Sequence, residues 1–152
     1  SNVTNMTYMF FAADAFNQDI SGWDTSKVTT MYGMFFGADV FNQPIGAWDT
    51  SNVTNLGYIL LAATAFDQDI SAWDISSITG GEGYSLDLAF TVSGMSDSNY
   101  NAALIAWSTA THNSDVYLGF NQATPSDSAG EAARASLVAD GWTIVDEEGT
   151  HT

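Results

Sequence analysis

Residues 28–52, VTTMYGMFFGADVFNQPIGAWDTSN, are one copy of a sequence repeat that fills the first half of the chain. A Trp-Asp pair recurs every 25 residues, at positions 23–24, 48–49 and 73–74. The same spacing relates three further sets of apolar residues: Phe16, Phe41 and Phe66; Ile20, Ile45 and Ile70; Val3, Val28, Val53 and Ile78. One such unit cannot bury its apolar residues alone, so this fixed period predicts units that pack on one another.

Each repeat divides into two halves by its hydrophobic spacing. In the second repeat the first half carries an i, i+3, i+4, i+7 stripe, which predicts a short helix that Thr29 could cap. The stripe residues are Met31, Met34, Phe35 and Ala38. The second half, residues 41–48, predicts a short strand, and residues 49–51 predict the turn that closes it. The units together predict an α/β repeat fold: a right-handed, leucine-rich-repeat-like solenoid with short parallel strands and short helices, closed by an enlarged C-terminal cap.

The repeat phase is lost near residue 80, which predicts two parts of one continuous domain: three 25-residue repeats in 1–79 and helix–strand units capping the solenoid in 80–152. In the second part we expect strands at 86–92, 116–120 and 142–145. We expect one helix over 97–108, capped by Ser96 or Asp97, and another that begins at 125–126 and stops at Gly141. The residues expected to face inward are Tyr100, Leu104 and Trp107 in the first helix and Ala132, Ala133, Leu137 and Val138 in the second. The polar residues 146–149 predict the end of the cap.

The composition excludes several functional classes. The 152-residue chain carries 18 acidic and only two basic side chains, for a net charge of −16. That balance excludes a nucleic-acid binder that neutralises phosphates and a polybasic membrane-surface protein. With 45% hydrophobic residues the chain is too apolar for a disordered acidic tail, and without cysteine it has no disulfide framework and no thiolate nucleophile. Its apolar runs are well short of a membrane span, so we expect no direct insertion into a bilayer.

The Trp column has two interpretations, which differ in where the indoles point. If residues alternate along each strand with Ile20 inward, the other side chains form an open sheet face that could bind a sugar or a peptide. The candidate binding residues on that face are Asp19, Ser21, Trp23, Trp48, Asp69, Ser71 and Trp73. If the strand instead ends or bends at Gly22, each Trp packs in the core between units.

The Asp column, which consists of Asp24, Asp49 and Asp74, also has two interpretations. Carboxylates in register on neighbouring strands would repel one another unless a cation such as Ca²⁺ offset their charge. Alternatively, each carboxylate accepts hydrogen bonds from the amides of its own turn. A second calcium candidate, residues 97–101, lacks the glycine and the final acid of a calcium loop. We therefore expect no cofactor and no metal that folding requires, with Ca²⁺ at the Asp column as the alternative.

The residues of the repeat also carry a family resemblance. The run Phe-Asn-Gln-Asp-Ile-Ser-x-Trp-Asp-Thr-Ser-x-Val-Thr-x-Met-x-x-Met-Phe, residues 16–35, resembles the repeat of bacterial BspA-like, leucine-rich-repeat surface lipoproteins and adhesins. Residues 100–107 and 132–144 are similar to the segment that often closes such arrays. The resemblance implies a leucine-rich-repeat-like fold, export and attachment to a cell surface, and it transfers no functional residue.

These observations predict a non-enzymatic, extracellular surface module that mediates adhesion or binds a protein or glycan of a host or neighbouring cell. No catalytic residues are expected, since His112 and His151 are the only histidines and neither lies in a recognisable catalytic pattern. Two alternatives stay open: a purely structural spacer of a cell-surface protein, and a carbohydrate-binding appendage of a polysaccharide-processing enzyme. Nucleic acid is not an expected partner.

The first repeat is expected to leave an apolar end incompletely covered. A Phe-Asn-Gln-Asp-Ile-Ser-x-Trp type of segment precedes the apolar stripe of each later repeat, but none precedes the stripe of the first repeat. The apolar residues expected at that end are Met6, Met9, Phe10 and Phe16. An uncovered end of a repeat array favours contact with another unit, so we expect either a neighbouring repeat or self-association through this end.

Overall fold

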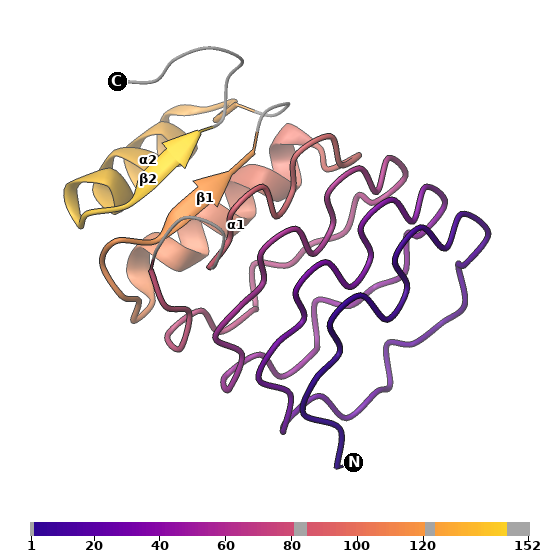
Figure 1. Ribbon diagram of the computed structural model, residues 1–152. Helices are drawn as coiled ribbons and strands as arrows, with labels where there is room; N and C mark the ends of the chain where they lie inside the picture. The colour runs from indigo at the N-terminus through magenta and orange to yellow at the C-terminus, as the bar shows by residue number, and fades with distance from the viewer. Residues whose placement is uncertain (1, 81–84, 121–123, 146–152) are drawn as a thin grey trace.

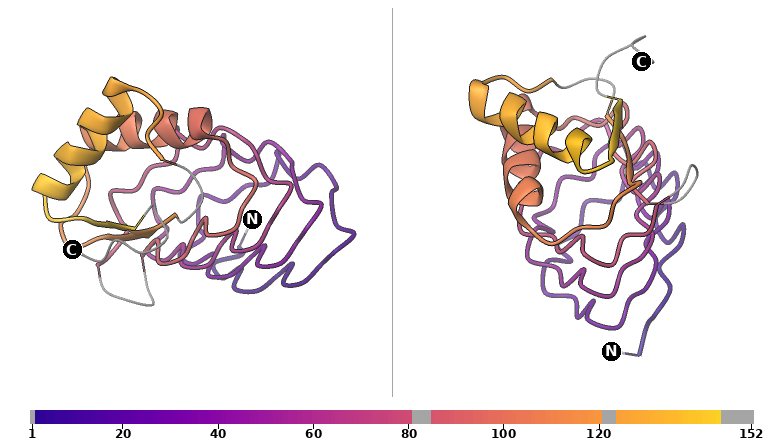
Figure 2. Two further views of the ribbon diagram at one scale, coloured as in Figure 1. Left: turned by 90° about the horizontal axis from the view of Figure 1, so that it is seen from above. Right: turned by 90° about the vertical axis from the view of Figure 1, so that its left-hand side faces the viewer.

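The computed structural model describes residues 2–80, 85–120 and 124–145 (Figure 1). Up to residue 80 the chain winds through successive turns that lie side by side, without a regular helix or strand (Figures 1 and 2). In the described residues after that point there are two helices and two strands: α1 (Asp97–Thr109), β1 (Tyr117–Gly119), α2 (Ser128–Ala139) and β2 (Thr143–Val145). Isolated parallel bridges join neighbouring turns at Asn5 and Thr30, at Thr30 and Asn55, and at Asn55 and Ser85. Each turn of chain therefore corresponds to one repeat of the sequence.

The predicted fold class is wrong. The repeats contain neither the short helices nor the short parallel strands of a leucine-rich-repeat-like solenoid. Among the described residues the only regular elements are α1, α2 and the open two-stranded parallel sheet of β1 and β2, all of them after residue 96. The repeats are held instead by β-turns and by single bridges between neighbouring turns of chain.

Residues in the left-handed region prevent the predicted helices. Tyr8 and Ala12 have φ angles of 55° and 50°, and the equivalent Tyr58 and Ala62 have 56° and 57°. An α-helix needs φ near about −63° throughout and a bond from each amide to the carbonyl four residues earlier. Here every second amide of the segment donates its hydrogen bond to the next repeat instead. The amide of Tyr8, for example, donates to the carbonyl of Tyr32. The turns still place residues spaced i, i+3, i+4 and i+7 on one side, so the stripe resembles that of a helix.

A tight turn replaces the predicted strand of each repeat. The amide of Trp48 donates to the carbonyl of Ile45, three residues earlier, and the other two repeats repeat this bond. In the first repeat the carboxylate of Asp19 accepts a 2.9 Å hydrogen bond from the amide of Ser21, within the same turn. Local side-chain hydrogen bonds of this kind compete with extended structure.

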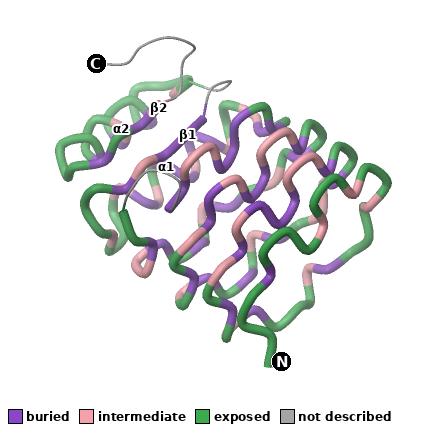
Figure 3. Tube along the Cα trace, viewed as in Figure 1, coloured by how far each residue is buried: buried purple, intermediate pink, exposed green. Residues whose placement is uncertain are grey.

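The apolar residues form one core that runs through the molecule (Figure 3). The stripe residues of the second and third repeats are fully buried: Met31, Met34, Phe35, Ala38, Leu56, Ile59, Leu60 and Ala63. The rings of Phe35 and Phe41 stack with centroids 3.9 Å apart, and Phe41 stacks on Phe66 of the next repeat at 6.1 Å. Burial of one such side chain stabilises the fold by about 1.5–3 kcal/mol. The predicted burial of the stripe is therefore correct, although its backbone is not helical.

The regular elements after the repeats lie close to their predicted positions. α1 begins after Ser96, whose hydroxyl caps it, and α2 begins after Asp127, whose carboxylate accepts from two amides of the first turn. Gly141 follows α2 with a φ of 99°, which suits glycine at a helix end. β1 and β2 pair in parallel, with Leu118 opposite Ile144.

Three details of this part differ from the prediction. Residues 86–92 are not a strand, because Leu88 and Val92 are left-handed and the segment continues the turn pattern of the repeats. α2 starts at Ser128, later than residues 125–126, because Asp127 provides the cap. Ala132 and Val138 are exposed rather than inward, since α2 turns only one face toward α1. The predicted cap at 146–149 lies outside the described residues.

Asp67 connects the third repeat to the start of α1. Its Oδ1 accepts hydrogen bonds from the amide of Ser96 at 2.8 Å and from Nδ2 of Asn99 at 2.7 Å. Partial burial of Asp67 opposes its ionisation, but these hydrogen bonds prevail and lower its pKa. The repeats and the helical part therefore share a charged contact. Their division at residues 79 and 80 stays a prediction.

Candidate functional site

The Trp column does not form an open face. Trp48 and Trp73 are buried, and their indole nitrogens donate to the carbonyl oxygens of Ile20 and Ile45 in the preceding repeat, at 3.2 and 3.0 Å. Trp23 alone is exposed, and its ring lies parallel to that of Trp48 with the centroids 6.4 Å apart. Trp48 and Trp73 therefore pack in the core between repeats, which was one of the two interpretations of the Trp column, and they are not available to a ligand.

The polar residues predicted beside the indoles stabilise turns. The carboxylate of Asp69 accepts from the amide of Ser71 at 2.8 Å, as Asp19 does from Ser21 in the first repeat. Hydrogen bonds from these serines lower the pKa of both aspartates. The carboxylates are ionised and exposed, but their geometry is explained by the local chain.

The Asp column has the geometry of Asx turns. Asp49 Oδ1 accepts from the amide of Ser51 at 3.0 Å and from its hydroxyl at 2.6 Å, and these bonds lower the pKa of Asp49. Asp24 makes the same pair of bonds with Ser26, and Asp74 accepts from the amide of Ser76. Within the described residues, no group of three or more Asp, Glu, His or Cys side chains is placed to hold a metal ion.

The remaining candidates have structural roles. The predicted calcium-loop segment, residues 97–101, forms the first turn of α1, where the side chain of Asn101 bonds that of Ser126. His112 lies edge-on to Trp142, with Nε2 3.6 Å from the carboxylate of Asp140. His151 lies outside the described residues.

A set of aromatic side chains, absent from the predicted site, covers the outer side of the turn segments. We define the aromatic face as Tyr8, Phe11, Tyr32, Phe36 and Tyr58. Edge-to-face contacts connect it along the repeats: Tyr8 to Tyr32 at 5.4 Å, Tyr32 to Tyr58 at 5.1 Å, and Phe11 to Phe36 at 5.2 Å between centroids. Phe11 is 53% exposed, and Tyr8, Phe11 and Phe36 line a shallow hollow.

Glycines make room for the tyrosines of this face. A Cβ atom at Gly33 would collide with the ring of Tyr8, and one at Gly57 would lie 3.2 Å from the ring of Tyr32. The second repeat reads Tyr-Gly at 32–33 where the third reads Gly-Tyr at 57–58. The rings of Tyr8 and Tyr32 each lie over a glycine of the next repeat. Because the order is exchanged, the two tyrosines do not share the 25-residue spacing and were not predicted as a set. The exchange of Tyr and Gly at equivalent positions is the sequence signal that indicates them.

The aromatic face is polar only at its hydroxyl groups. Burial, with a smaller effect of Tyr8, raises the pKa of Tyr32 to about 12, so its phenol stays protonated at neutral pH. The hydroxyl of Tyr58 donates to Asp87 at 3.5 Å. Both basic side chains of the chain, Lys27 and Arg134, bond groups elsewhere. The face can therefore stack on apolar or sugar surfaces and donate or accept hydrogen bonds.

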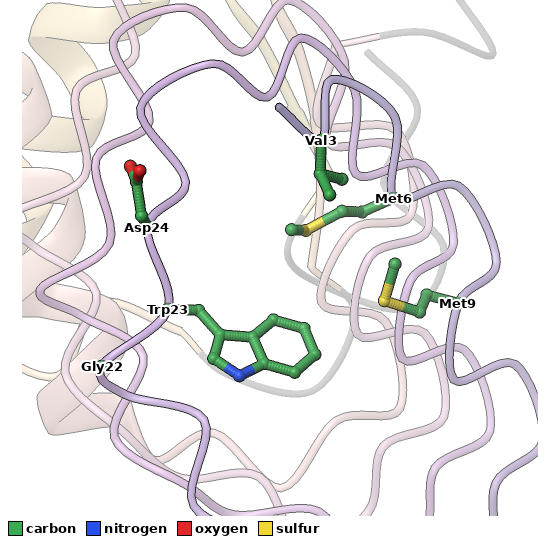
Figure 4. A pocket seen from close by; sticks show the side chains of 6 residues that line it. All are labelled: Val3, Met6, Met9, Gly22, Trp23 and Asp24. Carbon is green, nitrogen blue, oxygen red and sulfur yellow. The ribbon is translucent and has the colours of Figure 1, made fainter. Parts of the chain in front are cut away.

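A pocket opens at the outer end of the first repeat (Figure 4). Its volume is about 410 Å³, and its lining consists of Val3, Met6, Met9, Gly22, Trp23 and Asp24. The indole of Trp23 lies across the opening from the side chains of Met6 and Met9. This is the apolar end that the sequence predicts, with Met6 itself buried and Met9 exposed.

These features define a protein of aromatic-rich repeats, with ring-lined surfaces on its outer side and at its first repeat. The chain belongs to the family described as Mycoplasma protein of unknown function, DUF285, whose model matches residues 1–87. No curated protein and no solved structure matches the chain. No helix of the described residues is long and apolar enough to cross a bilayer.

Proposed function

We propose that the chain is a non-enzymatic interaction module of a bacterial cell surface, and that it binds a protein or glycan through the aromatic face. The observation that carries this proposal is the continuous row of exposed and half-exposed rings across three repeats. Tyrosine and phenylalanine provide large, rigid contact areas, and adjoining exposed apolar side chains on a folded protein often mark an interaction site.

The family and the sequence resemblance support the cellular setting of this proposal. The chain belongs to a family described from Mycoplasma, and residues 16–35 resemble the repeat of BspA-like surface proteins. A net charge of −16 is compatible with an extracellular medium, where salt screens repulsion beyond about 8–10 Å. Adhesion, export and surface attachment belong to the proposal on these grounds.

Glycan and peptide arrays probed with the purified protein test the proposal. The decisive variant is Phe11→Ser with Phe36→Ser, which removes ring area without changing charge, and Val138→Ser on the exposed side of α2 is the matched control. We expect array signals that the double variant loses and the control keeps. Signals that survive in the double variant would place binding elsewhere, and no signal from any protein would favour a spacer.

A further inference from the structure

We propose that the outer end of the first repeat is a docking surface for a polypeptide segment that itself has the repeat pattern of residues 26–50. The end surface is defined as Val3, Met9, Phe10 and Trp23 with the backbone of residues 4–12. Its backbone includes that of Tyr8 and Phe11, but none of its side chains belongs to the aromatic face, so this inference goes beyond the proposed function and does not depend on it.

Comparison of equivalent positions shows what this surface lacks. Val3 is 39% exposed and its equivalent Val28 is 0% exposed; Met9 is 44% exposed and Met34 is 0% exposed. Trp23 is 38% exposed, whereas Trp48 is 3% exposed. The later residues are buried because a repeat lies on each side of them. The same side chains at the first repeat therefore have the shape and polarity to be covered by one more unit.

The backbone of the end surface requires hydrogen-bond donors. Between the first and second repeats, the amides of residues 6, 8, 10 and 12 donate to carbonyl oxygens of residues 30, 32, 34 and 36, over 2.8–3.0 Å. The equivalent carbonyls of the first repeat belong to Asn5, Thr7, Met9 and Phe11, and no described residue donates to them. A docked segment must therefore present amides on alternate residues, as each repeat does toward the next.

The indole of Trp23 adds a requirement for an acceptor. Trp48 and Trp73 each donate from Nε1 to an isoleucine carbonyl of the preceding repeat. A segment of the same pattern would offer Trp23 the equivalent carbonyl, that of Ile45 in residues 26–50. Its own Met31, Met34 and Phe35 would cover Met6, Met9 and Phe10, as the first repeat covers the second.

This donor and acceptor pattern selects the occupant. Two copies of the chain joined end to end by a two-fold axis would bring the carbonyl row of one against that of the other. Acceptors facing acceptors leave all of them unpaired, which is costly when water is excluded. A repeat-type segment in parallel register supplies donors to the row, so the surface fits that segment better than a symmetric second copy.

A synthetic peptide with the sequence of residues 26–50 is the direct probe. Isotope-labelled protein is titrated with the peptide, and the indole N–H signal of Trp23 is followed by NMR. We expect saturable shifts of Trp23 and of residues 4–12, with at least tenfold weaker binding to Met9→Asp. Val138→Asp, which adds the same charge on α2, should bind as the parent protein does, and a scrambled peptide should not bind.

A fusion provides a second measurement that does not depend on the free peptide folding. Residues 26–50 are placed directly before Ser1, in phase with the repeat, and compared with a scrambled extension. We expect a higher melting temperature and protection of Trp23 from quenching only in the matched fusion. No gain from the fusion together with no peptide binding would overturn the proposal. Concentration-dependent dimerisation of the protein alone, lost in Met9→Asp, would overturn the choice of occupant.

Discussion

The indole nitrogen of Trp73 donates a 3.0 Å hydrogen bond to the carbonyl oxygen of Ile45 in the preceding repeat. Trp48 makes the same bond to Ile20 at 3.2 Å, and both indoles are buried. A buried indole N–H without an acceptor would cost about 1–3 kcal/mol. Trp48 and Trp73 therefore fill the core and bind their repeats to the ones before, which explains their regular spacing without a ligand.

Replacing a buried Trp of this column should strongly destabilise the protein. We expect Trp48→Ala to lower the free energy of unfolding by about 3–5 kcal/mol, because it leaves a large cavity. Trp23→Ala, at the exposed end of the same column, is the matched comparison and should cost clearly less. Urea denaturation followed by circular dichroism measures both, and equal losses would contradict the burial of Trp48.

Gly33 should resist substitution because of its backbone and its neighbour. Its φ is 58° and its Cβ position is occupied by the ring of Tyr8, so Gly33→Ala should destabilise by about 1–2 kcal/mol. Gly22→Ala is the control, since a Cβ there meets nothing within 4 Å. When Tyr8 is also replaced by Ala, Gly33→Ala should lower the free energy of unfolding only by the strain of a positive φ, because the ring contact is gone. An unchanged cost in that background would show that the ring contact contributes nothing.

Asp67 should make stability depend on acid. Its pKa is lowered in the folded protein, so its contribution is present above the ordinary pKa and is lost as the pH falls through the folded value. We expect Asp67→Asn to cost about 1 kcal/mol at pH 7 and to flatten the acid loss of stability. Asp14→Asn, another exposed carboxylate, is the control. Parallel acid curves for the Asp67 variant and the parent would refute this role.

Tyr32 should make stability depend on alkali. Its pKa is raised to about 12, chiefly by burial, so the folded state keeps a proton that the unfolded state loses near its ordinary pKa of 10.0. The contribution of protonated Tyr32 to the free energy of unfolding is complete below pH 10. It is lost as the pH rises through the pKa of Tyr32 in the folded protein. We expect Tyr32→Phe to reduce this alkaline loss, as measured by denaturation between about pH 9 and 12. An unaltered alkaline curve would contradict the raised pKa.

Removal of divalent cations should leave folding intact. The Asp column is hydrogen-bonded within its own turns, and the described residues hold no group suited to a metal. We expect the same melting temperature with and without a chelator at physiological salt. A small gain on adding Ca²⁺ is compatible with weak surface binding, whereas unfolding by the chelator would show that a metal site is required.

The candidate site shows where a search for strict periodicity fails. Trp23, Trp48 and Trp73 repeat without exception because the core demands the same shape at every junction, and this regularity made them candidates for a ligand. Tyr32 and Tyr58 break the period by one position, and their rings form the surface that the structure offers instead. At a surface, neighbouring side chains need only complement each other, so Tyr and Gly can exchange places.

The sequence by itself determined the 25-residue period, the burial of residues such as Phe35 and Ala38, and a helix capped by Ser96 or Asp97, of which the structure uses Ser96. These depend on apolar character and on hydrogen bonds between close neighbours in the chain. Tertiary structure alone decided that the stripes become turns, because the amide of Tyr8 bonds Tyr32 in the next repeat rather than a residue in its own turn. Hydrogen bonds between repeats replace those of a helix, and no spacing of apolar residues within one repeat encodes that choice.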